Sequence, residues 1–261
     1  MQGEVKEGFL LKYKDVTWMV KGVEHPEGFA VAFPRYVGNR KVSDTTSLSS
    51  ILNLVRRCDC APRPVPLVPL SKAIIMNPLD LIEADKVAKD FASILPKGAG
   101  LTGSRVVGIE GDLDLVYYNN FERVIKALRE MRESGETEPP KWGKWDSLGS
   151  GAVEYRSREA LLEGEWRGYH YSIRLVGPNR APTRPSVIGA RSVRGVIVEA
   201  QGNVMPYVYQ LDNGIVIESL RMQHSELKVG MEIEVRGSWE LSTLGERLHL
   251  GLGSYLNVIS Y

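Results

Sequence analysis

Two aspartates separated by one residue, Asp112 and Asp114, give the clearest chemical signal in this sequence. They begin an apolar run, residues 112–118, that predicts a buried strand. Side chains alternate across a strand, so both carboxylates should project from one face while Leu113 points to the core. Two adjacent carboxylates repel each other unless a cation lies between them. Hard oxygen ligands of this kind suit Mg²⁺, with Mn²⁺ as the alternative ion, and the pair is therefore a candidate metal site.

Gly103 and Ser104, upstream of the aspartates, are candidate phosphate-binding residues. A glycine lets the backbone approach a phosphate closely, and a serine hydroxyl with free N–H groups at a turn can bind an anion. Arg105 and Arg174 are candidate phosphate ligands through bidentate contacts, although a structural salt bridge would explain each arginine equally well. A metal ion beside bound phosphates can neutralise the charge that develops in nucleotidyl transfer. The segment therefore predicts a nucleotide site.

Other residues with chemical potential also have simpler structural explanations. An Asp-X-Asp after a glycine is often no more than a solvated turn. The four histidines are far apart in the sequence, which argues against a metal site built from them. Trp142 and Trp145 could stack on a base, although packing within the protein is the more common role of tryptophan.

The elements that would position the aspartates alternate between helix and strand. Apolar residues at helical spacing predict one helix over 78–95 and another over about 121–133. A short helix is expected over 158–162, and a strand over 169–176. Such alternation is typical of an α/β unit, and we place this central domain at residues 61–180.

An N-terminal β-rich module is expected over residues 1–60. Runs rich in valine and aromatic residues between 9 and 37, divided by a turn at 26–28, predict antiparallel strands. Residues 47–57 have the pattern of a short helix. Four prolines within 61–69 forbid a helix and favour an extended connector, which we take as the domain boundary.

A second proline-rich linker, residues 177–185, precedes a C-terminal segment that is strand-like throughout. Five or six short strands separated by glycines are expected over 187–261, and they predict a small β-barrel of the oligonucleotide/oligosaccharide-binding (OB) type. The expected fold class is therefore α+β and multidomain, with a central α/β domain between an N-terminal β-rich module and a C-terminal OB-like barrel.

Composition excludes several classes of protein. The chain has 261 residues, with 33 Lys+Arg against 32 Asp+Glu and a net charge of +1. This balance excludes a generally basic surface for gripping a nucleic-acid backbone. Neither a signal sequence nor an apolar run of membrane-spanning length is present, so we expect a cytoplasmic protein with no membrane partner. Cys58 and Cys60 have no zinc-type partners nearby, and we expect them to be unpaired and partly buried.

The central motif resembles a known signature. Thr102-Gly103-Ser104, followed by Asp112-Leu113-Asp114-Leu115, is similar to the pattern of the DNA polymerase beta-type nucleotidyltransferase superfamily. In that pattern a Gly-Ser precedes two acids separated by a hydrophobic residue. The chain more closely resembles a group of archaeal predicted nucleotidyltransferases. Besides the central motif, the likeness lies in Lys21–Gly28 leading into Arg35–Val37, in Val65–Leu67 and in Tyr171–Val176.

The resemblance implies Asp112 and Asp114 as catalytic metal ligands and the Gly-Ser pair as contacts of a triphosphate. Active members usually have a third carboxylate on a neighbouring strand, where it can bind metal and deprotonate the attacking hydroxyl. The outward positions of the expected strand 169–176 carry a histidine, a serine and an arginine instead. Glu154 is the candidate replacement, from a further strand. The interval between the Gly-Ser and the first aspartate is also short for the family.

Two functions remain open. The first is Mg²⁺-dependent nucleotide binding, with nucleotidyl transfer from an NTP to a hydroxyl acceptor that the sequence does not specify, RNA and protein being the candidates. The second is a catalytically inactive nucleotidyltransferase-like scaffold that acts as a nucleic-acid or protein interaction module. A third acid close to Asp112 and Asp114 would favour the enzyme, whereas only Ser172, His170 or Arg174 there would favour binding alone. The sequence specifies neither the base nor the oligomeric state.

Overall fold

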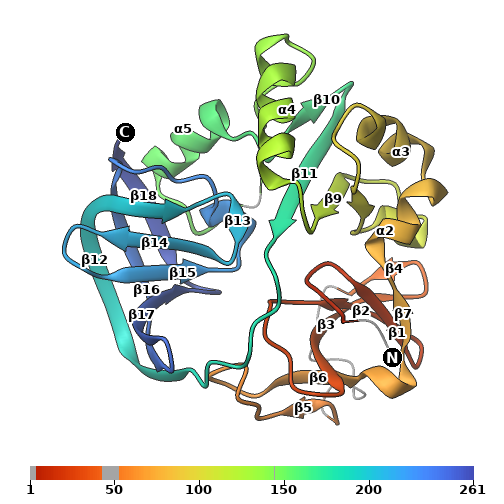
Figure 1. Ribbon diagram of the computed structural model, residues 1–261, viewed down its shortest axis with the longest axis horizontal. Coiled ribbons are helices and arrows are strands. Elements are labelled where there is room, and N and C mark those ends of the chain that lie inside the picture. Colours follow the sequence, from red (N-terminus) through yellow and green to blue (C-terminus); the bar gives the residue numbers. More distant parts are fainter. Residues whose placement is uncertain (1–3, 43–52, 144) are drawn as a thin grey trace.

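The fold is that of a computed structural model of the chain, which describes residues 4–42, 53–143 and 145–261. Strands predominate and form three sheets, and a few helices lie beside the central sheet. Figure 1 shows the N-terminal sheet at the bottom, the C-terminal barrel on the left and the central sheet with its helices at the top. Short 3-10 turns occur at Leu70–Lys72 (η1), Ile82–Ala84 (η2), Arg105–Val107 (η3) and Met222–His224 (η4).

The N-terminal sheet has seven strands in the order β5-β6-β3-β2-β1-β7, with β4 paired to β3. The predicted antiparallel strands between residues 9 and 37 are confirmed. One face of the sheet covers a small core that includes Leu11, Trp18 and Val68. The strands are β1 (Leu10–Tyr13), β2 (Val16–Val20), β3 (Phe29–Val37), β4 (Arg40–Lys41), β5 (Val55–Arg56), β6 (Val65–Pro69) and β7 (Ile74–Met76).

The proline-rich segment, expected to be a connector after a boundary at residue 60, is instead part of the N-terminal sheet. Residues 65–69 form β6, which pairs with β3 on one side and β5 on the other. Proline prevents a helix, but its fixed φ is compatible with an extended strand, and Leu67 N still donates to Leu54 O. The helix expected over 47–57 falls partly outside the described residues, and its described end contains strand β5 instead.

The central sheet has the order β10-β11-β9-β8, and β13 pairs with β11. β9 and β11 run parallel, joined by a crossover that contains α4, α5 and β10, so the predicted alternation of helix and strand is present. The strands are β8 (Gly100–Leu101), β9 (Leu113–Tyr117), β10 (Glu163–Trp166), β11 (Tyr169–Val176) and β13 (Val204–Met205). The helices are α2 (Pro78–Leu81), α3 (Lys86–Ser93), α4 (Phe121–Glu133) and α5 (Ser150–Glu159).

Two helix predictions need correction. The single helix expected over 78–95 is broken at Asp85, whose extended backbone ends η2 and whose side chain caps α3 by accepting from Ala88 N. The helix expected over 158–162 instead covers 150–159 and ends before β10. It packs along β18, where Asn257 Oδ1 accepts hydrogen bonds from the first backbone N–H groups of α5.

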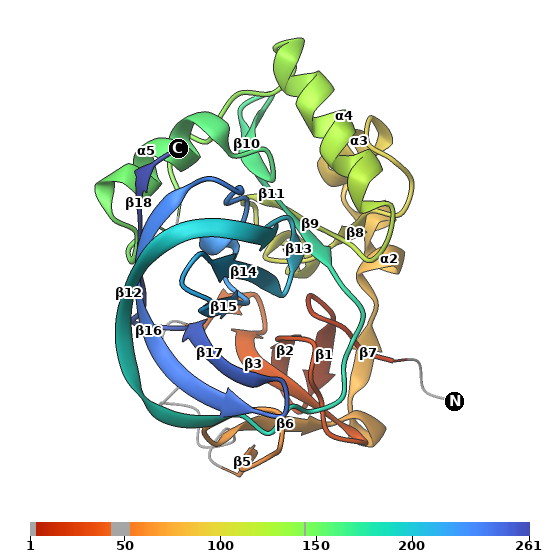
Figure 2. The ribbon, with the colours of Figure 1, turned by 60° about the vertical axis from the view of Figure 1, so that its left-hand side comes forward.

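The C-terminal sheet closes into a barrel, as the sequence predicts. Five strands form the ring β12-β14-β15-β17-β16, which closes where β16 pairs with β12, and β18 lies beside β16 outside the ring. Figure 2 shows the long, curved β12 wrapping around this barrel. The strands are β12 (Ser186–Gln201), β14 (Tyr207–Leu211), β15 (Val216–Ser219), β16 (Glu232–Ser242), β17 (Gly245–Leu250) and β18 (Tyr255–Ser260).

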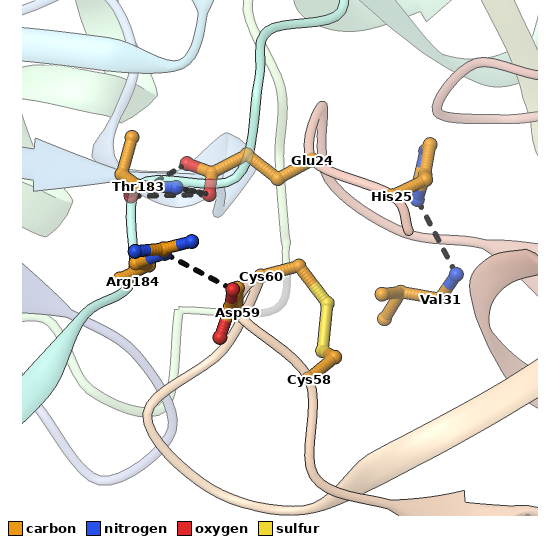
Figure 3. The surroundings of a disulfide bond; sticks show 8 residues. All are labelled: Glu24, His25, Val31, Cys58, Asp59, Cys60, Thr183 and Arg184. Carbon is orange, nitrogen blue, oxygen red and sulfur yellow. Dashed lines mark hydrogen bonds and ion pairs between the residues drawn. A yellow bond between two sulfur atoms is a disulfide. The ribbon is translucent and has the colours of Figure 1, made fainter. Parts of the chain in front are cut away.

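Buried charges join the N-terminal sheet to the barrel through the linker 177–185. Arg180 donates to Glu24 Oε1 at 2.7 Å and to both carboxylate oxygens of Glu218 at 2.9 and 3.0 Å. Glu24 also accepts from the backbone N–H and hydroxyl of Thr183, as Figure 3 shows. The linker is therefore fixed on both sides, and the three sheets pack as one body with a shared core between the central sheet and the barrel.

The two cysteines are paired, contrary to our expectation. Cys58 and Cys60 form a disulfide, because a turn at residues 59 and 60 folds the chain back on itself (Figure 3). Between them, Asp59 accepts from the backbone N–H of Arg184 at 2.8 Å and from its guanidinium at 3.0 Å. No helix within the described residues combines the length and the apolar character needed to cross a membrane.

Candidate functional site

A row of polar side chains crosses one face of the central sheet. Ser172 on β11 lies opposite Asp114 on β9 and also opposite Glu163 on β10. The hydroxyl of Ser172 donates a hydrogen bond of 2.6 Å to Asp114 Oδ1. Asp112 comes one residue before β9, on the same side of the strand as Asp114.

Asp112 and Asp114 line the same cavity, as their spacing predicts. It has a volume of about 530 Å³ and lies where the three sheets meet; we call it the interface cavity. The N-terminal sheet contributes Lys21 and Phe33, and the barrel side contributes Arg221 and Leu252, among other residues. A second cavity of about 450 Å³ shares several of these walls, including Asp114 and Lys21. The aspartates therefore face an open space between the sheets rather than the protein core.

Gly103 lies against Asp114. The segment that precedes Gly103 pairs with β9, and Thr102 N donates a hydrogen bond of 2.9 Å to Asp114 O. Gly103 has a φ of +77°, and a Cβ added to it would come 2.1 Å from Asp114 Oδ2. Only glycine leaves room for that carboxylate. Gly103 also lines the second cavity, so this half of the predicted phosphate-binding pair is at the site.

Ser104 and Arg105 are used for local structure. Ser104 begins the turn η3, where its carbonyl accepts from Val107 N and Ile109 N, and it lines neither of the two cavities. Arg105 forms an ion pair of 2.9 Å with Asp85 and donates to Gly111 O at 3.0 Å. Its side chain is buried by these contacts and lines neither cavity. The structure therefore places Arg105, a predicted phosphate ligand, away from both cavities and in contact with the protein's own groups.

Arg174 does line both cavities, and it shares a buried carboxylate with a lysine. Glu7 forms ion pairs with Arg174 and with Lys21 Nζ, the latter at 2.9 Å, and accepts from Gly22 N at 2.5 Å. Glu7 is almost completely buried, whereas about a third of the Lys21 side chain is exposed (34%). One carboxylate thus holds two cations from different sheets beside the cavity, leaving a positive charge next to the aspartates.

These neighbours shift the titration of Lys21 and Glu7. Burial, together with the Arg174 guanidinium, lowers the pKa of Lys21 to about 8, although the attraction of Glu7 opposes the shift. Burial acts to raise the pKa of Glu7, but Lys21 and Arg174 outweigh it, and the pKa is lowered. Lys21 therefore changes its charge close to physiological pH.

The sequence did not indicate Glu7 or Lys21 as site residues. Lys21 belongs to the Lys21–Gly28 run that contributes to the family resemblance, but nothing in that run suggests a partner for it. Its partner Glu7 lies in a short charged segment of ordinary composition. Only the packing of β1, β2 and β11 brings these charges together, so no local signal would have found them.

Within residues 4–42, 53–143 and 145–261, neither candidate for the third carboxylate is available beside Asp112 and Asp114. Glu154 lies on helix α5, not on a strand; it is exposed, pairs with Arg158 at 3.0 Å and does not line the interface cavity. Glu163 does line this cavity, but it is bound to Arg156 at 2.6 Å. Among the described residues, no group of three or more His, Cys, Asp or Glu side chains is arranged to hold a metal ion.

An aromatic pair forms another wall of the interface cavity. The ring of Trp142 stacks on His170, with 4.4 Å between ring centroids and an interplanar angle of 24°. His170 Nδ1 lies 3.2 Å from Glu165 Oε1, which fixes the imidazole in place. Trp142 remains half exposed, while Trp145 is partly buried. About half of the Trp142 side chain (51%) therefore remains accessible to a base that stacks on it.

The residues present suit a divalent cation only together with a ligand. Mg²⁺ is commonly held by one or two carboxylates and completes its coordination with water and substrate phosphates. Asp112 and Asp114 provide that minimal set, and Lys21 and Arg174 provide charge for an anion in the same cavity. No protein-family model matches this chain, and no curated protein matches it.

Proposed function

We propose that this chain binds a nucleoside triphosphate together with Mg²⁺, or with Mn²⁺, in the interface cavity. The observation that carries the proposal is that Asp112 and Asp114 share this cavity with Lys21 and Arg174. Carboxylates on one wall and cations on another suit a metal-bound polyphosphate, because each charge of the ligand complex then has a partner of opposite sign.

We also propose that the central sheet is a nucleotidyltransferase-like unit. Its support is the resemblance of the central motif, together with the parallel β9–β11 pair that carries the aspartates and Ser172. Bound Mg²⁺ would supply positive charge that neutralises the phosphates and fixes their orientation. Asp112 and Asp114 would hold the ion, while Lys21 and Arg174 would bind phosphate oxygens.

The barrel is proposed to be OB-like, with a role in positioning the ligand. Support comes from its strand order, in which the third and fifth strands, β15 and β17, are parallel neighbours, and η4 lies between the third and fourth strands. Residues 220–223 follow β15, residues 249–252 span the end of β17, and both segments line the interface cavity.

Binding without turnover is the function that the site supports best. Nucleotidyl transfer needs a group that deprotonates the attacking hydroxyl. Ser172 stands opposite Asp114 where the neighbouring strand would offer a third acid, and its hydroxyl donates to that aspartate instead. We therefore expect no covalent transfer from labelled NTPs to RNA or protein in Mg²⁺ or Mn²⁺. Labelled RNA or protein would contradict this expectation and would support nucleotidyl transfer as the function.

The aspartate pair is tested by replacing both residues, in the variant Asp112→Asn with Asp114→Asn. Isothermal titration calorimetry with Mg–ATP should show an affinity about 100-fold lower than wild type, because each lost carboxylate removes a charged metal contact. For tripolyphosphate in EDTA, without metal, the variant should instead bind more tightly than the wild type, since it has lost two negative charges that repel the anion.

The matched control is Asp90→Asn, an exposed aspartate on helix α3 that lies outside both cavities. It should leave both affinities unchanged. Equal Mg–ATP binding by the double variant and the wild type would show that the aspartates do not hold the metal.

Anion binding should also depend on pH through Lys21. Its pKa of about 8 means that the amine is charged below pH 8 and neutral above it. We expect the affinity for tripolyphosphate to fall roughly five- to tenfold between pH 7 and pH 9, as one charged contact is lost. Lys21→Arg should remove this dependence, because a guanidinium stays protonated throughout. The same slope in both proteins would exclude Lys21 as its source.

A further inference from the structure

Large apolar side chains stay exposed at the mouth of the interface cavity. Phe33 is 40% exposed, Trp142 is 51% exposed and Leu252 is 94% exposed, and all three line this cavity. Phe33, Trp142 and Tyr261 are the three most exposed aromatic side chains among the described residues, and only Tyr261 lies away from the cavity. Exposed apolar groups gathered at a cavity commonly mark a ligand site, whereas single ones scattered over a surface do not.

Each of these side chains comes from a different part of the chain. Phe33 is on β3 of the N-terminal sheet, Trp142 is in the segment between α4 and α5, and Leu252 is in the turn after β17. None of them is needed to close the core of its own sheet, because all three remain exposed. Their common feature is the cavity that they line.

Trp142 is already held in place. Its ring stacks on His170, and the imidazole is bound by Glu165 from the neighbouring strand β10. A side chain fixed before binding loses little conformational entropy when a ligand packs on it. An indole in that state is a suitable surface for a flat aromatic ring.

Resting on the proposed function, we propose that Phe33, Trp142 and Leu252 form the base-binding rim of the interface cavity. The phosphates then lie at the charged end, near Asp112 and Asp114, while the base packs on the apolar rim. The ligand class is a nucleotide whose base is recognised by its flat surface. Inorganic polyphosphate fills only the charged end.

The side-chain amide beside this rim, that of Gln223, is already hydrogen-bonded at both ends, which limits discrimination between bases. The amide of Gln223 accepts from Arg221 and donates to Ser147. An amide with both ends bonded is not available to read the edge of a base. Stacking tolerates any base, and larger rings stack better. ATP and GTP should therefore bind within about threefold of each other, and both more tightly than UTP.

The test compares Mg–ATP with Mg–tripolyphosphate by calorimetry, in the wild type and in Trp142→Ala. Wild type should bind ATP more tightly. Trp142→Ala should weaken ATP binding at least about fivefold, the lower end of the effect expected for one lost stacking contact, and leave tripolyphosphate binding unchanged. The matched control, Tyr261→Ala, removes an exposed aromatic that is outside the cavity and should change neither affinity.

Three outcomes would contradict the proposed base-binding rim. The first is that the wild type binds ATP no more tightly than tripolyphosphate. The second is that Trp142→Ala weakens the binding of both ligands equally, and the third is that it weakens the binding of neither. In each case, if the wild type still binds tripolyphosphate, the proposed binding of phosphates at the charged end is retained. If the wild type binds neither ligand, the proposed function fails as well, so the two failures are distinguishable.

Discussion

Arg156→Leu is expected to lower the free energy of unfolding by about 3–5 kcal/mol, because it leaves two buried carboxylates without their cation. The Arg156 side chain is only 2% exposed. Its guanidinium lies 2.6 Å from Glu163 Oε2 and 3.9 Å from Glu226 Oε2, and it also donates to Ser225 O at 3.1 Å. Urea denaturation at pH 7 measures the loss.

The neighbouring Arg158 provides the control. It lies on the same helix and pairs with Glu154, but 65% of its side chain is exposed. Arg158→Leu should change the free energy of unfolding by less than about 0.5 kcal/mol, since exposed ion pairs contribute little. Equal effects of the two replacements would contradict the buried-charge argument.

The effect of Arg156→Leu should also shrink in acid. In the wild type, burial acts to raise the pKa of Glu163, but Arg156 outweighs it and the pKa is lowered. A carboxyl with a lowered pKa stabilises the fold above its unfolded pKa and loses that contribution as the pH falls through its folded pKa. The variant lacks this contribution, so the two proteins should differ less at pH 4 than at pH 7. Because Glu163 also lines the interface cavity, the variant is expected to weaken the ligand site too.

Gly103→Ala is expected to damage the site and the fold together. The added methyl carbon would lie 2.1 Å from Asp114 Oδ2, at a residue whose φ is +77°. The positive φ costs about 1–2 kcal/mol for a residue with a side chain, and the collision must also displace the carboxylate. We expect a loss of at least about 2 kcal/mol in the free energy of unfolding, and roughly tenfold or greater loss of Mg–ATP affinity.

Gly108→Ala separates these two causes. Gly108 has nearly the same φ, +73°, but nothing lies within 4 Å of an added Cβ. It should show the backbone cost of about 1–2 kcal/mol without the loss of affinity. If both variants bind Mg–ATP equally well, Gly103 has no special role at Asp114.

The periodicity of the sequence was enough to define the strands that carry the site. The run 112–118 contains β9, and the predicted strand 169–176 is β11 residue for residue. A strand turns successive side chains to opposite faces, so Asp112 and Asp114 had to project together wherever the strand was placed. The closed C-terminal barrel followed in the same way, from short strands separated by glycines.

Predictions about partners were less successful, because they depend on contacts between distant segments. An arginine alone does not indicate whether it will reach a ligand site: Arg105 and Arg174 each pair with a carboxylate, but only Arg174 also lines the cavity. Glu154 could not be excluded from the site until α5 was known to carry it away. The proline-rich segment was equally ambiguous, since an extended chain can be a linker or a strand.

By itself the sequence therefore determined the local elements, the shared face of Asp112 and Asp114, and the barrel, because these follow from short-range periodicity. Only the tertiary structure decided which charges surround the aspartates. Glu7 and Arg174 are 167 positions apart, yet their contact brings Lys21 to the cavity wall. Such contacts form when whole sheets pack together, and no short stretch of sequence contains both partners.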